Sequence, residues 1–380
     1  MGIELSTEDF PDGAEGALRR ICVIGAGAWG TALASVARHA GREVTLWGRN
    51  PQVIDEINTR HSNEAFLPGA PLPKGILATT DLSRACGGAD AVLIVTPSRS
   101  LRDICRQIRP YLTAGIPVAL CCKGIEVGSG LPLSEVAAAE LPDHPIGALS
   151  GPTFARETVL GHPTAATVAF PFSFEDRRHP AGSPAARLAL ALSCKSFRPY
   201  ISDDLIGVEI GGAVKNVIAI ACGMMAGAGF AENTRAALIT RGMAEIKRLA
   251  ETLGGQRETV SGLSGAGDLM LTCSSPKSRN MSLGMQLGQG IPRDRCFDGR
   301  QVVVEGEVNA VSVMDLARQV GVELPICAAV HAVLHEGAPL GATFAQLLAR
   351  PLQGEGASLS IRLRNPEGGG AIAGQARRRT

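Results

Sequence analysis

The stretch at residues 20–50, "RICVIGAGAWGTALASVARHAGREVTLWGRN", sets the fold of the first half of the chain. Its apolar start, "ICVIG", predicts a strand, "TALASVARHA" predicts a helix that ends near Gly41, and "EVTLW" predicts a second strand. A G-x-G-x-x-G motif joins the first strand to the helix. In this strand–turn–helix–strand setting the motif predicts a dinucleotide-binding unit, although the same letters alone also fit a structural turn.

The three glycines of the motif have separate expected roles. Gly25 permits the tight turn after the strand, Gly27 lets the backbone approach a pyrophosphate, and Gly30 lets the helix pack closely on the strand. The free N–H groups at the helix start then face the anion. We therefore expect this turn to bind a dinucleotide.

The residue after the second strand bears on the type of cofactor. NAD sites usually place an acidic residue there to bind the ribose hydroxyl, whereas this chain has "LWGRN" with Arg49. An arginine suits a ribose 2′-phosphate, which favours NADP, but a solvated loop arginine fits the sequence as well. NADP or NAD is thus the expected cofactor.

The alternation of strands and helices continues beyond the first unit. The runs "ADAVLIVTPS", "IPVALCCKG" and "HPIGALSGPTF" read as parallel strands buried on both faces. Ligands on such sheets bind at the carboxyl ends of the strands, which here hold Lys123 and the segment 150–153. Lys123 is therefore a candidate ligand residue, with an ordinary surface lysine as the alternative.

The second half of the chain reads as helices only. We expect a Rossmann-type α/β domain at residues 20–203 followed by an all-α domain at 204–353. An acidic arm at 1–19 and a Gly- and Arg-rich tail at 354–380 are expected to be disordered. The segment "FPFSFEDRRHPAGSP" at 170–184 is expected to be a loose surface insertion.

A lone lysine marks the run "GGAVKNVIAIACGMMAGAGF" at 211–230. The run nearly reaches the length of a membrane span. Its glycines and the amphipathic helix that follows favour a buried helix of a globular domain instead. A buried lysine needs a partner or a lowered pKa, so Lys215 is a candidate acid/base, unless its amine reaches solvent.

A third region, "SGLSGAGDLMLTCSSPKSRN", carries further polar candidates. Asp268 is expected either to cap a helix or to orient Lys215. Ser278, Arg279 and Asn280 open another helix, where a hydroxyl, a guanidinium, an amide and free N–H groups together suit a phosphate. The alternative is a plain helix start with an exposed arginine.

Composition excludes several classes of protein. Charged residues make up 19% and the net charge is +1, so no global field favours nucleic acid. The ten cysteines contain no C-x-x-C pair and do not cluster with the seven histidines. Reduced thiols, no metal site and a cytoplasmic location without a membrane span are therefore expected.

The chain resembles the NAD(P)-dependent glycerol-3-phosphate dehydrogenases of bacterial type, over about residues 20 to 335. The resemblance rests on stretches in the family's order: "GAGAWGTALA", "LWGRN", "NEAFLPG", "VTPS", "CKGIE", "LSGPTFARE", "GHPTA", "GVEIGGAVKNVIAIACGM", "AALITRGMAEIKRL", "GLSGAGDLMLTCSSPKSRN" and "VVEG". It implies NAD(P)H-dependent reduction of dihydroxyacetone phosphate to sn-glycerol 3-phosphate for glycerophospholipid synthesis. A homodimer is expected by analogy only.

The resemblance also implies roles for single residues. Lys215 of "AVKN" would be the catalytic acid/base. Substrate contacts are implied for Lys123, Gly151, Thr153, Lys215, Asp268, Ser278, Arg279 and Asn280. Besides Gly25, Gly27 and Gly30, cofactor contacts are implied for Ala28, Trp29, Arg49, Lys123, Ala155, Arg279, Val303 and Glu305.

Two other functions keep the same layout. One is a dehydrogenase that acts on a hydroxy acid or a ketopantoate-like substrate, which would need a carboxylate clamp. The other is a non-catalytic NADP-sensing protein, which would bind nucleotide without oxidising NADPH in the presence of a ketone. The chain departs from the family's usual "SKG" at Cys122, but no catalytic position is lost.

Overall fold

A computed structural model describes residues 17–350, 352–353 and 362–363 of the chain. The arm predicted at 1–19 lies outside these residues except for 17–19. The tail predicted at 354–380 lies outside them except for 362–363. Those two residues form strand β10 (Arg362–Leu363), which pairs antiparallel with β9 (Leu352–Gln353).

The first part of the chain forms an eight-stranded sheet in the order β3-β2-β1-β4-β5-β6-β7-β8. The strands are β1 Arg20–Ile24, β2 Glu43–Trp47, β3 Ile76–Thr79, β4 Ala91–Ile94, β5 Val118–Leu120, β6 Ile146–Ser150, β7 Thr164–Ala169 and β8 Phe197–Ser202. All neighbouring pairs run parallel except β6 and β7. The order of the first six strands is that of a dinucleotide-binding sheet, so the predicted fold class is confirmed.

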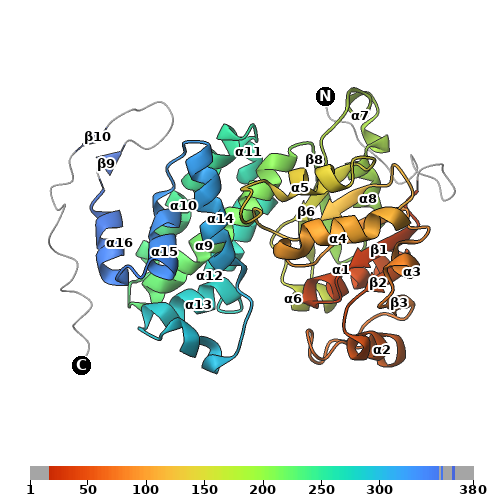
Figure 1. Cartoon of the computed structure of the whole chain (residues 1–380), viewed down its shortest axis with the longest axis horizontal. Coiled ribbons are helices and arrows are strands. Elements are labelled where there is room, and N and C mark those ends of the chain that lie inside the picture. The colour runs from red at the N-terminus through yellow and green to blue at the C-terminus, as the bar shows by residue number, and fades with distance from the viewer. Residues whose placement is uncertain (1–16, 351, 354–361, 364–380) are drawn as a thin grey trace.

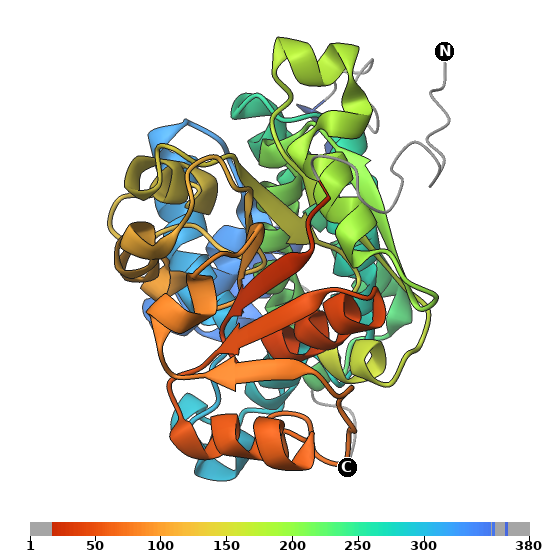
Figure 2. The ribbon, with the colours of Figure 1, turned by 90° about the vertical axis from the view of Figure 1, so that its right-hand side faces the viewer.

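Helices cover both faces of this sheet (Figures 1 and 2). They are α1 Ala28–His39, α2 Pro51–Arg60, α3 Leu82–Cys86, α4 Leu101–Ile108, α5 Leu133–Glu140, α6 Ala155–Val159, α7 Phe174–Arg178 and α8 Pro184–Leu192. Burial on both faces of the sheet explains why the sequence of β1 is continuously apolar. Ile21 and Val23 enter the core beneath α1 and α8, whereas Cys22 and Ile24 enter the core beneath α4 and α5.

The segment 170–184 differs from the loose insertion that the sequence predicts. It contains the short helix α7, which begins with a capping box. The Ser173 hydroxyl accepts a hydrogen bond from the Asp176 N–H, and the Asp176 carboxylate accepts one from the Ser173 N–H. Phe170 and Ser183, near the two ends, are fully buried and anchor the segment to the core.

The second part of the chain is helical and lies beside the sheet part (Figure 1). Its helices are α9 Leu205–Gly227, α10 Glu232–Thr252, α11 Arg257–Val260, the π-helical turn η5 Leu263–Gly267, α12 Asp268–Ser274, α13 Arg279–Gly288, α14 Glu305–Gln319, α15 Pro325–His335 and α16 Leu340–Leu348. Strand β8 ends at Ser202 and α9 begins at Leu205, on either side of the boundary that the sequence predicts.

Helix α9 is the centre of the helical part, and its glycines explain the close packing around it. A Cβ atom added to Gly223 would lie 2.3 Å from the Met281 carbonyl oxygen of α13, and one added to Gly227 would lie 2.0 Å from that of Met285. The two helices therefore approach backbone to backbone. Within the described part of the chain, α9 alone is long and apolar enough to cross a membrane, but 89% of its apolar window is buried inside the protein.

Candidate active site

The three glycines of the dinucleotide turn occupy three different environments. Gly25 has φ of 125°, a conformation that favours glycine. A Cβ atom added to Gly30 would lie 1.7 Å from the Gly25 carbonyl oxygen, so only glycine lets α1 begin this close to β1. At Gly27, by contrast, an added Cβ would meet nothing within 4 Å. The turn therefore leaves an open approach at the start of α1, which fits a pyrophosphate.

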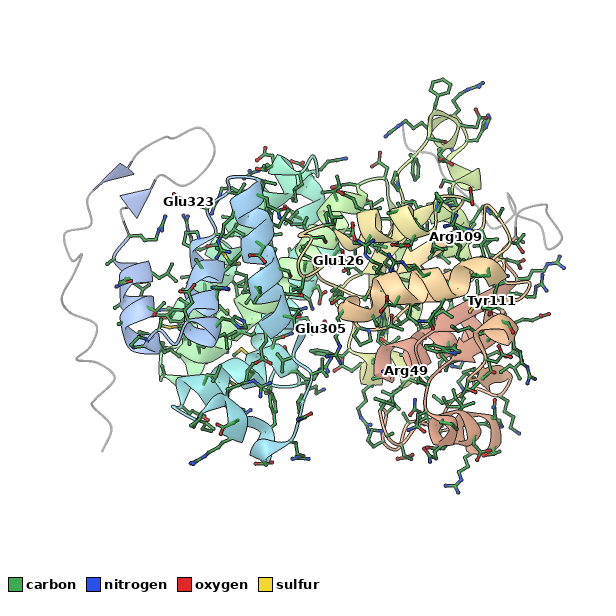
Figure 3. The ribbon with its side chains drawn as sticks, in the orientation of Figure 1. Arg49, Arg109, Tyr111, Glu126, Glu305 and Glu323 are labelled. Atoms are coloured by element: carbon green, nitrogen blue, oxygen red, sulfur yellow. The ribbon has the colours of Figure 1, made fainter. Side chains whose placement is uncertain are left out.

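Other residues expected to contact the cofactor gather around this turn. Ala28, Trp29 and Ala155 are partly buried and pack against the same core as α1. Arg49 is exposed just after β2. In Figure 3 Arg49 and Glu305 are labelled on those sides of the sheet part and the helical part that face each other.

The centre of the site is a buried carboxylate between two lysines. Lys215 on α9 donates from Nζ to Asp268 Oδ1 at 2.7 Å, and Lys123, which follows β5, donates from Nζ to Asp268 Oδ2 at 2.5 Å. The side chains of Lys215, Lys123 and Asp268 are only 8%, 16% and 3% exposed. The sheet part and the helical part thus each contribute a lysine to one carboxylate.

These contacts decide between the readings that the sequence left open. The Lys215 amine does not reach solvent, and Lys123 is not an ordinary surface lysine. Asp268 is the first residue of α12, but its carboxylate binds the two lysines rather than capping the helix. The orienting role for Asp268 is therefore the one that the geometry supports.

Burial and neighbouring charges have opposite effects on the pKa values of Lys215 and Asp268. Burial lowers the pKa of the Lys215 amine below its usual value, although the nearby Asp268 carboxylate partly opposes this effect. For the Asp268 carboxyl, burial raises the pKa, but Lys123 and Lys215 together outweigh it and leave the pKa below its usual range. At neutral pH the carboxylate is ionised, and Lys215 is brought closer to exchanging its proton.

Sequence reasoning missed Thr272. Its hydroxyl accepts a hydrogen bond from Lys215 Nζ at 2.8 Å and lies 2.6 Å from the Asp268 carbonyl oxygen, to which it donates. Lys215 therefore has two fixed acceptors, which orient its amine. The spacing in the sequence could have indicated Thr272, because it lies four residues after Asp268 and therefore on the same face of α12.

The residues expected to form a phosphate clamp, Ser278, Arg279 and Asn280, lie at the start of α13. The Ser278 hydroxyl caps the helix by accepting from the Met281 N–H at 3.2 Å. The Asn280 side-chain amide makes two hydrogen bonds. Its nitrogen donates to Asn216 Oδ1, and its oxygen accepts from the Gly306 N–H, each at 2.9 Å. Ser278 therefore caps α13, and Asn280 joins α13 to α9 and α14.

Arg279 is the exposed cation among these three residues. Its Nη1 donates to the Val303 carbonyl oxygen at 2.7 Å, which places the guanidinium beside the segment that leads into α14. Glu305, the first residue of α14, accepts from the Asn216 amide at 3.3 Å. Because Asn216 directly follows Lys215, these bonds place the start of α13 and the start of α14 next to Lys215.

The loop after β6 completes this end of the sheet. A Cβ atom added to Gly151 would lie 2.8 Å from the Ala166 Cα atom, so the loop turns tightly against β7. Pro152 approaches Gly267, the residue before Asp268, and Thr153 is partly buried. The loop that carries Gly151 and Thr153 therefore borders the two-lysine centre.

Comparisons with known proteins agree with this geometry. Residues 20–173 match the model of the NAD-dependent glycerol-3-phosphate dehydrogenase N-terminus, and residues 204–345 match that of the C-terminus. The chain belongs to the NAD-dependent glycerol-3-phosphate dehydrogenase family. It is 51% identical over 340 residues to the glycerol-3-phosphate dehydrogenase [NAD(P)+] of Rhodospirillum rubrum, covering 90% of this chain and 95% of that protein.

Two further relatives support the same assignment. The glycerol-3-phosphate dehydrogenase [NAD(P)+] of Parvibaculum lavamentivorans is 49% identical, over 89% of this chain and 99% of that protein. The crystal structure of glycerol-3-phosphate dehydrogenase from Coxiella burnetii superposes with a TM-score of 0.80 at 36% identity, covering 88% of this chain and 99% of that one. As a glycerol-3-phosphate dehydrogenase, the chain is an NAD(P)-dependent oxidoreductase that reduces dihydroxyacetone phosphate to glycerol 3-phosphate.

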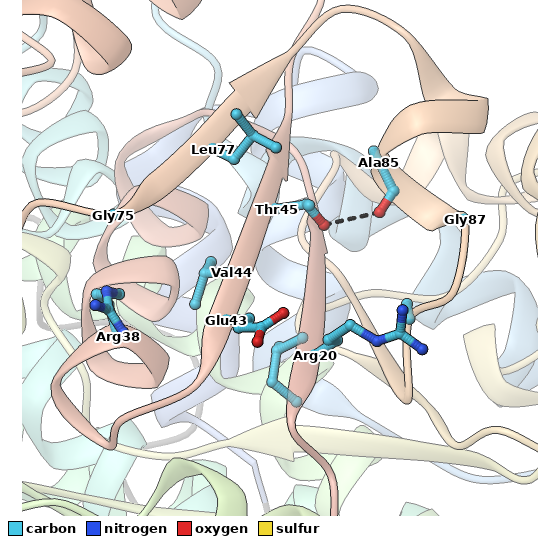
Figure 4. Close-up of a pocket in the computed structure, with 11 residues that line it drawn as sticks. Arg20, Arg38, Glu43, Val44, Thr45, Gly75, Leu77, Ala85 and Gly87 are labelled. Atoms are coloured by element: carbon cyan, nitrogen blue, oxygen red, sulfur yellow. Dashed lines mark hydrogen bonds between the residues drawn. The ribbon is translucent and has the colours of Figure 1, made fainter.

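One pocket of this glycerol-3-phosphate dehydrogenase chain lies away from the two-lysine centre. A cavity of about 280 Å³ opens beside β1, β2 and β3, and its lining includes Arg20, Arg38, Glu43 and Leu77 (Figure 4). Arg20 and Glu43 are the first residues of β1 and β2, so this cavity lies at the amino ends of the strands. Ligands on parallel sheets bind at the other end, where the lysines are.

Among the described residues, no three His, Cys, Asp or Glu side chains gather where they could hold a metal ion. All ten cysteines are free, and burial raises the pKa of the Cys121 and Cys122 thiols beside Lys123. The cations at and beside this centre are Lys123, Lys215 and Arg279.

Proposed function

We propose that Lys215 is the acid/base for reduction of dihydroxyacetone phosphate in this chain, with Asp268 and Thr272 as its orienting partners. The observation that carries the proposal is the buried Lys215–Asp268 pair, joined across the two parts of the chain by Lys123. A bound NADH or NADPH supplies the hydride that the C2 carbonyl carbon accepts. Lys215 stabilises the negative charge that develops on the carbonyl oxygen and donates the proton that makes it a hydroxyl.

The remaining residues of the site bind and orient the substrate. Lys123 faces the same carboxylate as Lys215 and supplies a second positive charge near the carbonyl. Arg279, exposed at the start of α13, binds the phosphate of the substrate and fixes its position relative to Lys215. The loop with Gly151 and Thr153 borders the carbonyl from the side of the sheet.

A direct assay tests this function. Absorbance of the reduced nicotinamide should fall when dihydroxyacetone phosphate is added with NADPH or with NADH. Unphosphorylated dihydroxyacetone and a 2-keto acid should give much slower rates, because neither carries the phosphate that Arg279 binds. Equal rates with and without the phosphate would remove the clamp from the proposal, and no oxidation with any ketone would indicate a protein that only binds nucleotide.

Replacing Arg279 by alanine is expected to raise the KM for dihydroxyacetone phosphate about 30-fold, because a charge-assisted hydrogen bond of about 2 kcal/mol is lost. The kcat at saturating substrate should fall much less. Steady-state kinetics measure both constants. Lys277→Ala is the matched control, since Lys277 is a cation two residues away whose ion pair is with Glu157 at 2.9 Å. An unchanged KM in Arg279→Ala would show that the phosphate binds elsewhere.

We further propose that Arg49 binds the ribose 2′-phosphate of NADPH. Arg49→Ala should then raise the KM for NADPH about 10-fold and leave the KM for NADH within about twofold, because only NADPH carries that phosphate. Comparing the two coenzymes in one variant controls for general damage. An equal rise for both coenzymes would mean that Arg49 does not read the 2′-phosphate.

We also propose a cytoplasmic location and a homodimer, with the product supplying glycerophospholipid synthesis. Ten free cysteines in one chain support a reducing compartment. Cell fractionation tests the location, and sedimentation equilibrium of the purified chain tests the dimer.

A further inference from the structure

Helix α9 carries Glu209, Gly212 and Lys215 in one row. Glu209 and Gly212 contact the sheet part, and Lys215 meets Asp268 and Thr272 of α12. Residues spaced by three lie along one ridge of a helix. At the middle of the ridge, a Cβ atom added to Gly212 would lie 3.4 Å from Lys123 Cγ and 3.3 Å from Ser150 Oγ. The stem of Lys123 therefore runs past α9 where the ridge has no side chain, between Glu209 and Lys215.

Glu209 attaches this ridge to helix α5 of the sheet part. Its Oε1 accepts from the Ser134 N–H at 2.8 Å, and its Oε2 accepts from the Ser134 hydroxyl. Helix α5 needs such a partner, because its own N-cap residue is Pro132, which makes no side-chain capping bond. A carboxylate from α9 thus satisfies the start of a helix in the other part of the chain.

A second carboxylate, that of Asp204, binds the start of α9 to another segment of the helical part. The Asp204 carboxylate accepts from the Gly207 N–H and the Gln256 N–H, both at 2.8 Å, which ties α9 to the segment before α11. The Asp204 carboxylate connects only elements of the helical part. The Glu209–Ser134 contact, in contrast, fixes α9 relative to the strand ends that carry Lys123.

We propose that Glu209 is a positioning residue for the reduction, which through Ser134 holds α9 in the axial register that sets Lys215 against Lys123 and Asp268. The proposal rests on the proposed function of Lys215 and goes beyond it. Lys215 follows Glu209 by six residues, which is about 9 Å along the axis of α9. A shift of α9 by about 1 Å therefore moves the Lys215 amine relative to the carbonyl, and such misplacement can cost about 100-fold in rate.

The surroundings of Glu209 identify the conservative variant. The pKa of Glu209 is raised to about 7, because burial, helped by the neighbouring Glu135 of α5, outweighs the lowering effect of its bonds with Ser134. Lys123 and Cys122 line the same small cavity as Glu209. A neutral side chain of the same shape is therefore compatible with the site. In Glu209→Gln the amide oxygen still accepts the Ser134 N–H, and the amide nitrogen donates to the Ser134 hydroxyl.

A second buried glutamate provides the control. Glu245 of α10 accepts from the Ile326 N–H at 2.7 Å and the Cys327 N–H at 3.3 Å, at the start of α15. Burial also raises its pKa to about 7. Glu245 therefore resembles Glu209 in chemistry and in capping a distant helix, but it joins two helices of the helical part and touches neither lysine.

The experiment compares Glu209→Ala and Glu209→Gln with Glu245→Ala and Glu245→Gln in the full chain. It measures kcat and KM for dihydroxyacetone phosphate, the Kd for NADPH by fluorescence, and Tm. We expect kcat per NADPH-binding molecule to fall about 30-fold in Glu209→Ala and less than about threefold in Glu209→Gln, with the Kd for NADPH within about twofold of wild type in both. The Glu245 variants should lower Tm and keep kcat within about twofold.

Three outcomes would overturn the proposal. They are a wild-type kcat in Glu209→Ala, equal losses of kcat in the Glu209 and Glu245 alanine variants, and an equal loss of kcat in the alanine and glutamine variants of Glu209.

If Glu209→Ala does not fold, Ser134→Ala is the substitute. It removes only the hydroxyl bond and should lower kcat about threefold without changing the Kd for NADPH, and an unchanged kcat would overturn the proposal. Wild-type protein inactive with dihydroxyacetone phosphate would contradict the proposed function itself, whereas an active wild type with a fully active Glu209→Ala would contradict only the positioning role.

Discussion

Replacing Lys215 by alanine is expected to lower kcat for dihydroxyacetone phosphate by about 10³-fold, within the range of 10²- to 10⁴-fold for loss of a general acid. This factor corresponds to about 4 kcal/mol of transition-state stabilisation. The carbonyl oxygen of the substrate would lose both its proton donor and the positive charge that stabilises it. Lys123 cannot replace the amine, because it approaches Asp268 from the sheet side at the other carboxylate oxygen.

The Kd for NADPH should change less than about threefold in Lys215→Ala, because the dinucleotide turn lies at Gly25–Gly30 in the sheet part. Single-turnover rates and fluorescence titration measure the two effects separately. Lys215→Met keeps the apolar stem without the amine and is the packing control, since the side chain is almost completely buried. Activity restored by methionine would assign the loss in alanine to a cavity, and wild-type turnover in either variant would remove Lys215 from the mechanism.

Local patterns in the sequence were enough to predict most of the fold. The strand at 20–24 and the helix after it follow from an apolar run, three glycines and a helix-forming segment, all within 25 residues. The buried helix that carries Lys215 was also predicted, because one charge in a long apolar run has few structural explanations. Segment 170–184 was misread as loose, since its prolines and charges obscured the capping box of Ser173 and Asp176.

The arrangement of the site depends on contacts between distant residues, which no local pattern contains. Asp268 is 145 residues from Lys123 and 53 from Lys215, and the sequence left open whether it caps a helix or orients a lysine. Only the packing of α12 on α9 decides this. The contacts of Asn280 and Glu209 were hidden for the same reason. The partner of Asn280 lies on α14 of the same helical part, and the partner of Glu209 lies on α5 of the sheet part, so both become neighbours only in the folded chain.

Replacing Asp268 by asparagine is expected to lower the free energy of unfolding at pH 7 by about 3–5 kcal/mol, the usual cost of leaving buried charges without their partner. Lys123 and Lys215 would face each other without a carboxylate between them. Each ammonium group disfavours the charged form of the other, so the pKa of Lys215 should fall still lower than in wild type. A lysine that has lost its proton cannot act as the acid, and kcat should fall about 100-fold.

The pH dependence distinguishes this charge effect from simple loss of packing. Above the lowered folded pKa of a lysine, the native state binds fewer protons than the unfolded state, in which the amine keeps its proton to about pH 10.4. The same holds for Lys215 in wild type, but the larger lowering in Asp268→Asn should make the stability of the variant rise more steeply from pH 7 to pH 9. The difference in the free energy of unfolding between the two proteins should therefore narrow. Urea unfolding at pH 7 and at pH 9 measures the free energy of unfolding of both proteins.

Asp204→Asn is the control, because Asp204 is a buried carboxylate that accepts hydrogen bonds from the N–H groups of Gly207 and Gln256. The loss of unfolding free energy in this variant should be the same at both pH values. A gap that stays constant for Asp268→Asn would mean that the two lysines do not titrate against each other, and that the carboxylate stabilises the fold through hydrogen bonds alone.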